Sequence, residues 1–284
     1  MARAAANVSR LQLAMRIPPD TGHLRALGMC ALSADEVLLT FGDSLRTVSL
    51  HTAQLSAHEP IIQYIVYGVE FDAHTDTLLL LVWPLTNIYG NSHDYDYFQL
   101  VSLRRNASEW LEVQRFDTTI SGSFSDLNYI SNFAVCDSRV LIGHERTLYV
   151  LEVSAEHTLR YAGSVPWQSF FYAVACTRLD GVTLVAFSHR ISVSLLRLAS
   201  LPLRLVPLAS VSLTGPHELL FREDLLLVNN WNKAIVSFRV SDNTLTEQRV
   251  LLEAKNGVGW RAWALASDRL VLCNGKELLV YAFT

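Results

Sequence analysis

The stretch Asp137–Val153, DSRVLIGHERTLYVLEV, contains the pattern that decides the fold. An Asp in a small polar turn is followed by the apolar run Val140–Ile142, a second polar turn, and the alternating segment Thr147–Val153. Alternation with a period of two is typical of a β-strand with one buried face. The stretch therefore predicts two antiparallel strands joined by tight polar turns.

The same pattern recurs along the whole chain. Its copies begin at Asp35, Asp76, Asp137, Asp180, Asp224 and Asp268. Equivalent positions in the copies are separated by 41, 62, 43, 42 and 45 residues; they are Val37, Leu78, Val140, Thr183, Leu225 and Leu270. Steps of about 40–45 residues match one four-stranded propeller blade. The long step contains two insertions, 84–95 and 117–128.

Each copy supplies further strand-like segments on both sides of this pair. First strands are expected at 26–32, 65–71, 133–136, 171–176, 218–221 and 261–266, and fourth strands at 110–116, 158–165, 204–213 and 245–252. The sequence therefore predicts an all-β fold, a six-bladed β-propeller of four-stranded antiparallel blades, in one domain over residues 1–284.

The two chain ends complement each other in this scheme. The last repeat stops after Phe283, one strand short, whereas a spare strand, Ser9–Arg16, precedes the first repeat. An open ring would expose two sheet edges that favour aggregation. We therefore expect Ser9–Arg16 to pair with Lys276–Phe283 and to close the ring.

Composition argues against several functional classes. The net charge is −4 and no Lys/Arg cluster is present, so nucleic-acid binding is not expected. Apolar runs are much shorter than the roughly 20 residues of a membrane-spanning helix, so no membrane partner is expected. Four dispersed cysteines favour reduced thiols and a cytoplasmic location. The arginines of Met1–Arg16 resemble those of a mitochondrial presequence, but the closing strand is the favoured interpretation.

In outline the chain resembles the WD40-like group of β-propellers. Gly22-His23 and Gly215-Pro216-His217 precede inner strands, where WD40 proteins place a Gly-His pair. The Trp-Asp pair of that family is missing, and the kelch and Asp-box motifs are missing too. The resemblance implies an architecture and assigns no functional residues.

Candidate binding residues lie in the turns between second and third strands and in the connections between blades. Propellers present both kinds of loop on one face, and aromatic, Arg and His side chains on such a rim are typical of a binding surface. The candidates are Tyr89, His93, Tyr95, His144, Arg146, Trp167, His189, Arg190 and Trp231. The alternative is that Trp167 and Trp231 pack against neighbouring blades.

Other chemical motifs have structural interpretations. The repeated Asp residues are expected to cap turns, and Cys30, Cys136 and Cys176 to pack in the core. The segment His93–Asp96 could coordinate a cation, but a solvated loop is the favoured interpretation, so no metal or cofactor is expected.

These observations favour a non-enzymatic interaction module that binds a protein or peptide partner on the loop face. The alternatives are a propeller enzyme of the hydrolase or lactonase type, by fold analogy, and a glycan-binding propeller.

Overall fold

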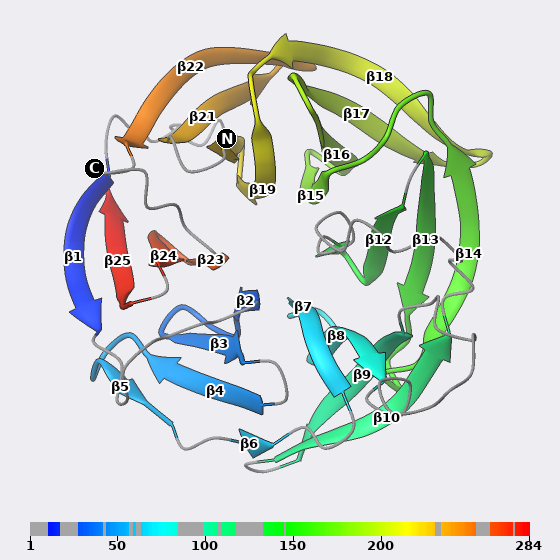
Figure 1. Cartoon of the computed structure of the whole chain (residues 1–284). Coiled ribbons are helices and arrows are strands. Elements are labelled where there is room, and N and C mark those ends of the chain that lie inside the picture. The colour runs from blue at the N-terminus through cyan, green and yellow to red at the C-terminus, as the bar shows by residue number, and fades with distance from the viewer. Residues whose placement is uncertain are drawn as a thin grey trace, which may run out of the picture.

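The computed structural model describes residues 11–17, 28–41, 44–56, 59–60, 64–84, 99–106, 109–117, 133–144, 146–230, 234–253, 262–274 and 276–284. These residues form six small antiparallel sheets arranged in a ring around a central channel (Figure 1). The chain is a six-bladed β-propeller, as predicted. No helix among the described residues is long and apolar enough to cross a membrane.

Blades 2 to 5 each use four consecutive strands, from the channel outward. Blade 2 contains β7 (Tyr64–Asp72), β8 (Thr77–Pro84), β9 (Gln99–Asn106) and β10 (Glu109–Asp117). Blade 3 contains β11 (Phe133–Cys136), β12 (Arg139–His144), β13 (Thr147–Val153) and β14 (Leu159–Pro166). Blade 4 contains β15 (Ala173–Leu179), β16 (Val182–His189), β17 (Ser192–Ser200) and β18 (Leu203–Ser212). Blade 5 contains β19 (Pro216–Arg222), β20 (Leu225–Asn230), β21 (Ala234–Ser241) and β22 (Thr244–Glu253).

Blades 1 and 6 depart from this scheme. Blade 1 contains β2 (Gly28–Ala31), β3 (Glu36–Thr40) and β4 (Ser44–Ser49), and two short strands, β5 (Gln54–Leu55) and β6 (Glu59–Pro60), both pair with β4 on its outer side. Blade 6 contains β23 (Ala262–Ala266), β24 (Arg269–Cys273), β25 (Leu278–Phe283) and, as its outer strand, β1 (Leu11–Ile17).

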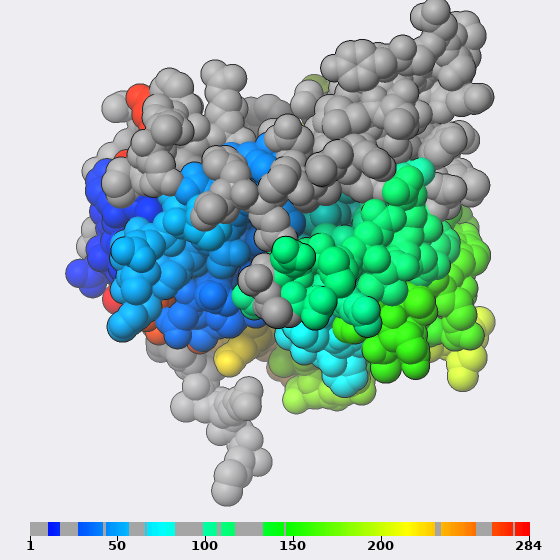
Figure 2. Space-filling view, turned by 90° about the horizontal axis from the view of Figure 1, so that it is seen from below, coloured from blue at the N-terminus to red at the C-terminus, as the bar shows by residue number. Residues whose placement is uncertain are grey.

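The predicted closure of the ring is therefore confirmed. β1 pairs antiparallel with β25, from Leu11 opposite Phe283 to Ile17 opposite Leu278. Arg16 also forms an ion pair of 2.8 Å with Glu277. In Figure 1, β1 lies beside β25. Figure 2 shows the outer wall of the ring from β1 (blue) through blade 1 (lighter blue) to β10 (green).

The apolar core is divided among the junctions between blades. The described residues form six buried clusters, and each combines side chains from two neighbouring blades. This arrangement explains the uninterrupted apolar second strands: a strand such as β8 contributes Leu79 to one junction and Leu80 to the next, so both of its faces are buried.

Outer strands are only half covered, and their sequences alternate accordingly. The outer strands β1, β10, β14, β18 and β22 each contain a register shift against their neighbour. Such bulges increase local twist and make an exposed edge a poorer template for pairing with another chain. The ring is thus closed by β1 and bounded by irregular edges.

The repeated Asp residues lie in turns between first and second strands, as predicted, but the capping mechanism is different. Asp76, Asp137 and Asp180 have φ near +50°, a left-handed conformation that Asp tolerates better than most residues. The side chain of Asp137 forms an ion pair with Arg178 of the next blade. In the described part of blade 2, the turn is capped by Asp72 at the end of the first strand. Its carboxylate accepts a hydrogen bond from the backbone N–H of His74 at 3.2 Å.

Candidate functional site

Two features of the ring could serve a function: a rim on one face and a cavity in the channel. The rim is formed where second strands end and third strands begin, and where the chain passes from one blade to the next. The pairs His144–Thr147, Thr147–Pro166 and Ala173–Ser188 place these loops at the same end of blades 3 and 4.

Phe170, in the connection between blades 3 and 4, is the most prominent aromatic side chain of the described rim. Its side chain is 51% exposed, although its neighbour Phe171 is buried against Phe187 at 4.3 Å between ring centroids. Phe170 therefore lies on a connection that is anchored in the core.

Two predicted site residues hold Phe170 in place. The guanidinium of Arg146 lies 4.9 Å from the centroid of the Phe170 ring, within cation–π distance. Nδ1 of His189 donates a hydrogen bond to the Phe170 carbonyl oxygen at 3.0 Å, which fixes the His189 tautomer because a carbonyl can only accept. The structure thus brings residues 43 positions apart in the sequence to one point of the rim.

The remaining described candidates have different environments. Arg190 is exposed beside Ile191, which is 67% exposed, and its carbonyl accepts a hydrogen bond from the Gly215 amide at 3.1 Å. His144 is buried beneath the rim. Trp167 is half-buried, with its ring 6.3 Å from that of Phe187. The predicted residues Tyr89, His93, Tyr95 and Trp231 lie outside the described residues, as do residues 85–95 and 118–128 of the two insertions.

We call the surface formed by Arg146, Phe170, His189, Arg190 and Ile191 the aromatic rim. Three of these residues were predicted from sequence as binding residues, and Phe170 and Ile191 were missed. The doublet Phe170-Phe171, in a connection between two blades, was the available signal for Phe170.

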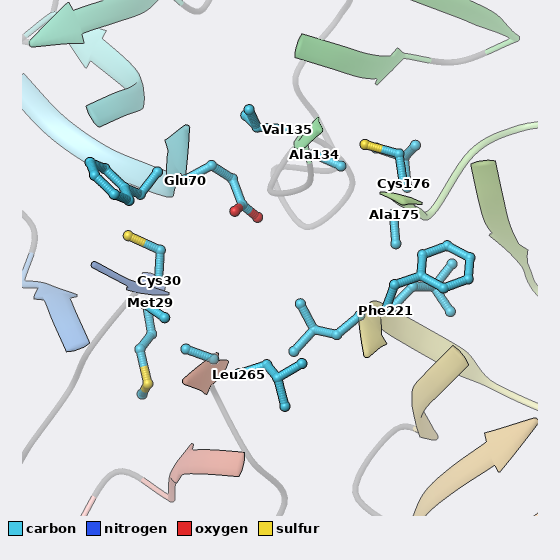
Figure 3. A pocket seen from close by; sticks show the side chains of 15 residues that line it. Met29, Cys30, Glu70, Ala134, Val135, Ala175, Cys176, Phe221 and Leu265 are labelled. Atoms are coloured by element: carbon cyan, nitrogen blue, oxygen red, sulfur yellow. The ribbon is translucent and has the colours of Figure 1, made fainter. Parts of the chain in front are cut away.

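The second feature is a cavity of about 210 Å³ at the centre of the ring, formed by the innermost strands of all six blades (Figure 3). Its lining residues are Met29, Cys30, Ala31, Glu70, Phe71, Ala134, Val135, Val174, Ala175, Cys176, Leu219, Leu220, Phe221, Ala264 and Leu265. Glu70 is the single charged residue in this described lining, and its carboxyl group points into the cavity.

Sequence reasoning missed Glu70 and misjudged the surroundings of two cysteines. Glu70 interrupts the apolar strand β7, and burial raises the pKa of its carboxyl group to about 8. Cys30 and Cys176 pack into apolar clusters, as predicted, but both also border the cavity. Burial raises the pKa of both thiols, and the nearby Glu70 carboxylate raises it slightly further. A thiol with a raised pKa is a weak nucleophile at neutral pH.

A second, partly buried carboxyl group with a raised pKa lies on the opposite side of the ring. Glu218 on β19 accepts a hydrogen bond from the side-chain amide of Asn229 at 3.0 Å. Burial raises the pKa of Glu218 to about 7, and the bond from Asn229 opposes this shift. The carboxyl group of Glu70, by contrast, has no hydrogen-bond partner among the residues that the structure describes.

The described residues contain no group of three or more His, Cys, Asp or Glu side chains arranged to hold a metal ion.

Comparison with known proteins assigns the chain to no family, because no protein-family model and no characterised protein matches its sequence.

Proposed function

We propose that this propeller is an interaction module that binds a peptide or protein segment on the aromatic rim. The observation that carries the proposal is Phe170 at the junction of two blades: its aromatic side chain is half exposed and lies under the Arg146 guanidinium, and its backbone carbonyl is bonded by His189. Rigid aromatic anchors beside Arg are typical of the residues that dominate binding energy in interfaces.

The surroundings of Phe170 indicate the chemistry of the partner. Arg146 and Arg190 are exposed and positively charged, and Ile191 adds apolar surface beside them. The β-sheets beneath hold these loops in fixed positions, so little ordering of the rim would oppose binding. A segment that combines an aromatic or aliphatic residue with acidic residues fits this surface.

The test is a selection of peptides from a random displayed library against the whole protein. We expect the recovered peptides to be enriched in Asp, Glu and apolar residues. Phe170→Ala is expected to weaken their binding about 30-fold, the effect of losing an anchor worth about 2 kcal/mol. Arg190→Gln is expected to slow association and to reduce its dependence on salt.

Tyr161→Ala is the matched control. Tyr161 is an aromatic residue on the outer strand β14, and it is 52% exposed, nearly the same fraction as Phe170. This variant should bind the peptides like the unaltered protein, and both variants should melt at similar temperatures. Undiminished binding by Phe170→Ala, or equal losses in both variants, would contradict the proposal.

A further inference from the structure

The central cavity contains a carboxyl group whose surroundings do not explain its presence. Glu70 lies on an innermost strand, is partly buried and points into the cavity, and the other lining residues carry no charge (Figure 3). A carboxyl group that is largely removed from water and has no partner destabilises a fold unless another group compensates for it. No described residue provides such a group, so the cavity is suited to a ligand that would.

The size of the cavity limits what that ligand can be. Pockets for drug-sized molecules usually have volumes of about 300–1,000 Å³. The cavity measures about 210 Å³, which is suited to a few heavy atoms, such as a short alkyl chain with one polar end. Its walls would contact the alkyl chain, and Glu70 is the single charged group of the lining that could contact the polar end.

The cavity lies nearer to the face that carries the repeated Asp turns than to the aromatic rim. On five inner strands the lining includes the last or next-to-last residue before that turn: Ala31, Phe71, Val135, Phe221 and Leu265. The six turns place one Asp per blade around this end of the channel. Arg178 pairs with Asp137, Arg239 with Asp224, and Arg269 with Asp35 and Asp268.

Asp76 and Asp180 make no ion pair with a described residue, so this end retains negative charge. A ring of carboxylates at the mouth of a low-dielectric channel attracts cations and raises their local concentration. The carboxylates around the mouth and the Glu70 carboxyl group in the cavity therefore both favour a positively charged ligand.

We propose that the central cavity binds an aliphatic ammonium group, with its alkyl chain against Leu220 and Leu265 and its charge on the Glu70 carboxylate. The ammonium group can belong to a free alkylamine or to a lysine side chain of a bound protein. This site is separate from the aromatic rim, and the proposal does not depend on the proposed function.

Protonation of Glu70 gives the proposal a second observable. The titratable groups that face Glu70 from other inner strands are the thiols of Cys30 and Cys176, and Cys176 in turn contacts Cys136. Burial raises the pKa of the Cys30 and Cys176 thiols, and it raises that of Glu70 to about 8. A cation must therefore displace a proton at neutral pH, and its affinity should rise as the pH approaches 8.

The experiment is a calorimetric titration of the whole protein with n-butylamine. The alkylammonium stays protonated between pH 6 and pH 8, because a lysine-like amine has a pKa of about 10.4. We expect the affinity to rise on the order of 50-fold between these two pH values, in proportion to the ionised fraction of Glu70. Glu70→Gln, which keeps the shape of the side chain, should abolish the binding at pH 8.

Two controls make the result specific. Glu218→Gln removes another carboxyl group whose pKa is raised by burial, but which lies outside the cavity lining, and should leave n-butylamine binding unchanged. 1-Butanol, which has the same chain and no charge, should not bind at pH 8. Binding of 1-butanol that strengthens toward low pH would overturn the proposal, because it would show that Glu70 serves as a neutral hydrogen-bond donor.

A further titration separates the two sources of the ammonium group. An acetylated, amidated lysine peptide should bind at least as tightly as n-butylamine when the natural ligand is a lysine side chain, and should fail to bind when the ligand is a free amine. Failure of both probes to bind the unaltered protein at pH 8 would overturn the proposal. Loss of peptide binding at the rim in Phe170→Ala, with n-butylamine binding retained, would show that the sites are independent.

Discussion

Blades 3 and 6 reach the same architecture by different routes of the chain. In blade 3 the outer strand β14 follows β13 directly, whereas in blade 6 the outer strand β1 comes from the opposite end of the chain. The two outer strands nevertheless share one burial pattern: buried at the first and seventh positions, and mostly exposed between them. The environment of an outer strand is therefore set by the neighbouring blades and not by its connection.

The difference between the blades lies in what each pairing does for the rest of the molecule. The β13–β14 hairpin completes one blade. The β1–β25 pairing completes a blade and also joins the two ends of the ring. Leu11 packs at the junction of blades 5 and 6, and Ile17 at the junction of blades 6 and 1.

Deletion of residues 1–17 should have the largest effect. It exposes the full edge of β25 and removes buried side chains from two junctions, so we expect a large fall in melting temperature and aggregation of the protein. Thermal melts and light scattering measure both effects. A synthetic peptide of residues 9–18 should restore solubility by pairing with β25. A truncated protein with unchanged melting and solubility would show that β1 does not close the ring.

Leu11→Ala and Leu159→Ala form a matched pair of substitutions. Each residue occupies the first buried position of its outer strand, and each is 5% exposed. We expect each substitution to lower the free energy of unfolding by about 2–4 kcal/mol, through lost burial and the cavity left behind. Denaturant unfolding at equilibrium provides the measurement.

Their kinetics should differ even when their stabilities agree. Leu11 pairs with Phe283, almost the full length of the chain away, and such distant contacts are expected to form late in folding. Leu11→Ala should therefore mainly speed unfolding, whereas Leu159→Ala, in a local hairpin, should slow folding. Equal effects of the two substitutions on the folding rate would show that the ring closes before the transition state.

Two partly buried carboxyl groups with raised pKa values extend the comparison to blades 2 and 5. The pKa of Glu70 is raised to about 8 and that of Glu218 to about 7, both above the usual value of about 4.5. The folded protein thus holds these protons to a higher pH than the unfolded chain does. The stability associated with them is fully present below about pH 4.5, and it is lost as the pH rises through the folded pKa.

Substitution of either residue by Gln should remove this loss. At pH 8 we expect Glu70→Gln to be more stable than the unaltered protein by at least about 1 kcal/mol, and at pH 4 to be equally stable. Glu218→Gln should show a smaller gain, because Asn229 already stabilises the Glu218 carboxylate. Urea unfolding at both pH values measures the difference. A Glu70→Gln protein that is less stable at pH 8 would show that the carboxylate has a partner.

The sequence predicts the framework of this molecule because the framework repeats. Six Asp turns, regularly spaced except for one step with two insertions, together with a missing last strand and a spare first strand, were sufficient to predict the blades and their closure. Strand ends were close to those observed: the segment predicted at 9–16 is β1 at 11–17, and that at 158–165 is β14 at 159–166.

Sites are harder to predict, because they depend on distances between repeats. The sequence shows His189 and Arg146 in similar turns, but it does not show that both meet at Phe170. Glu70 stands out as a charge within an apolar strand, which is a recognisable signal of a special environment. That Cys30 and Cys176 lie around it becomes evident only when the inner strands are arranged in a ring.

Ion pairs across two junctions should give the smallest effects and the most direct comparison. Arg178 pairs with Asp137 between blades 4 and 3, and Arg269 pairs with Asp35 between blades 6 and 1, at 3.6 Å. Both arginines are substantially exposed, so each pair should contribute less than about 1 kcal/mol and should be screened by salt. We expect Arg178→Gln and Arg269→Gln to lower stability by similar small amounts in dilute buffer and by nothing measurable in 1 M NaCl. If Arg269→Gln costs several times more than Arg178→Gln, and the excess disappears at high salt, then charge as well as β1 closes the ring. Equal losses of stability in the two variants would show that the ring is closed by the strand pairing and by the apolar contacts of Leu11 and Ile17.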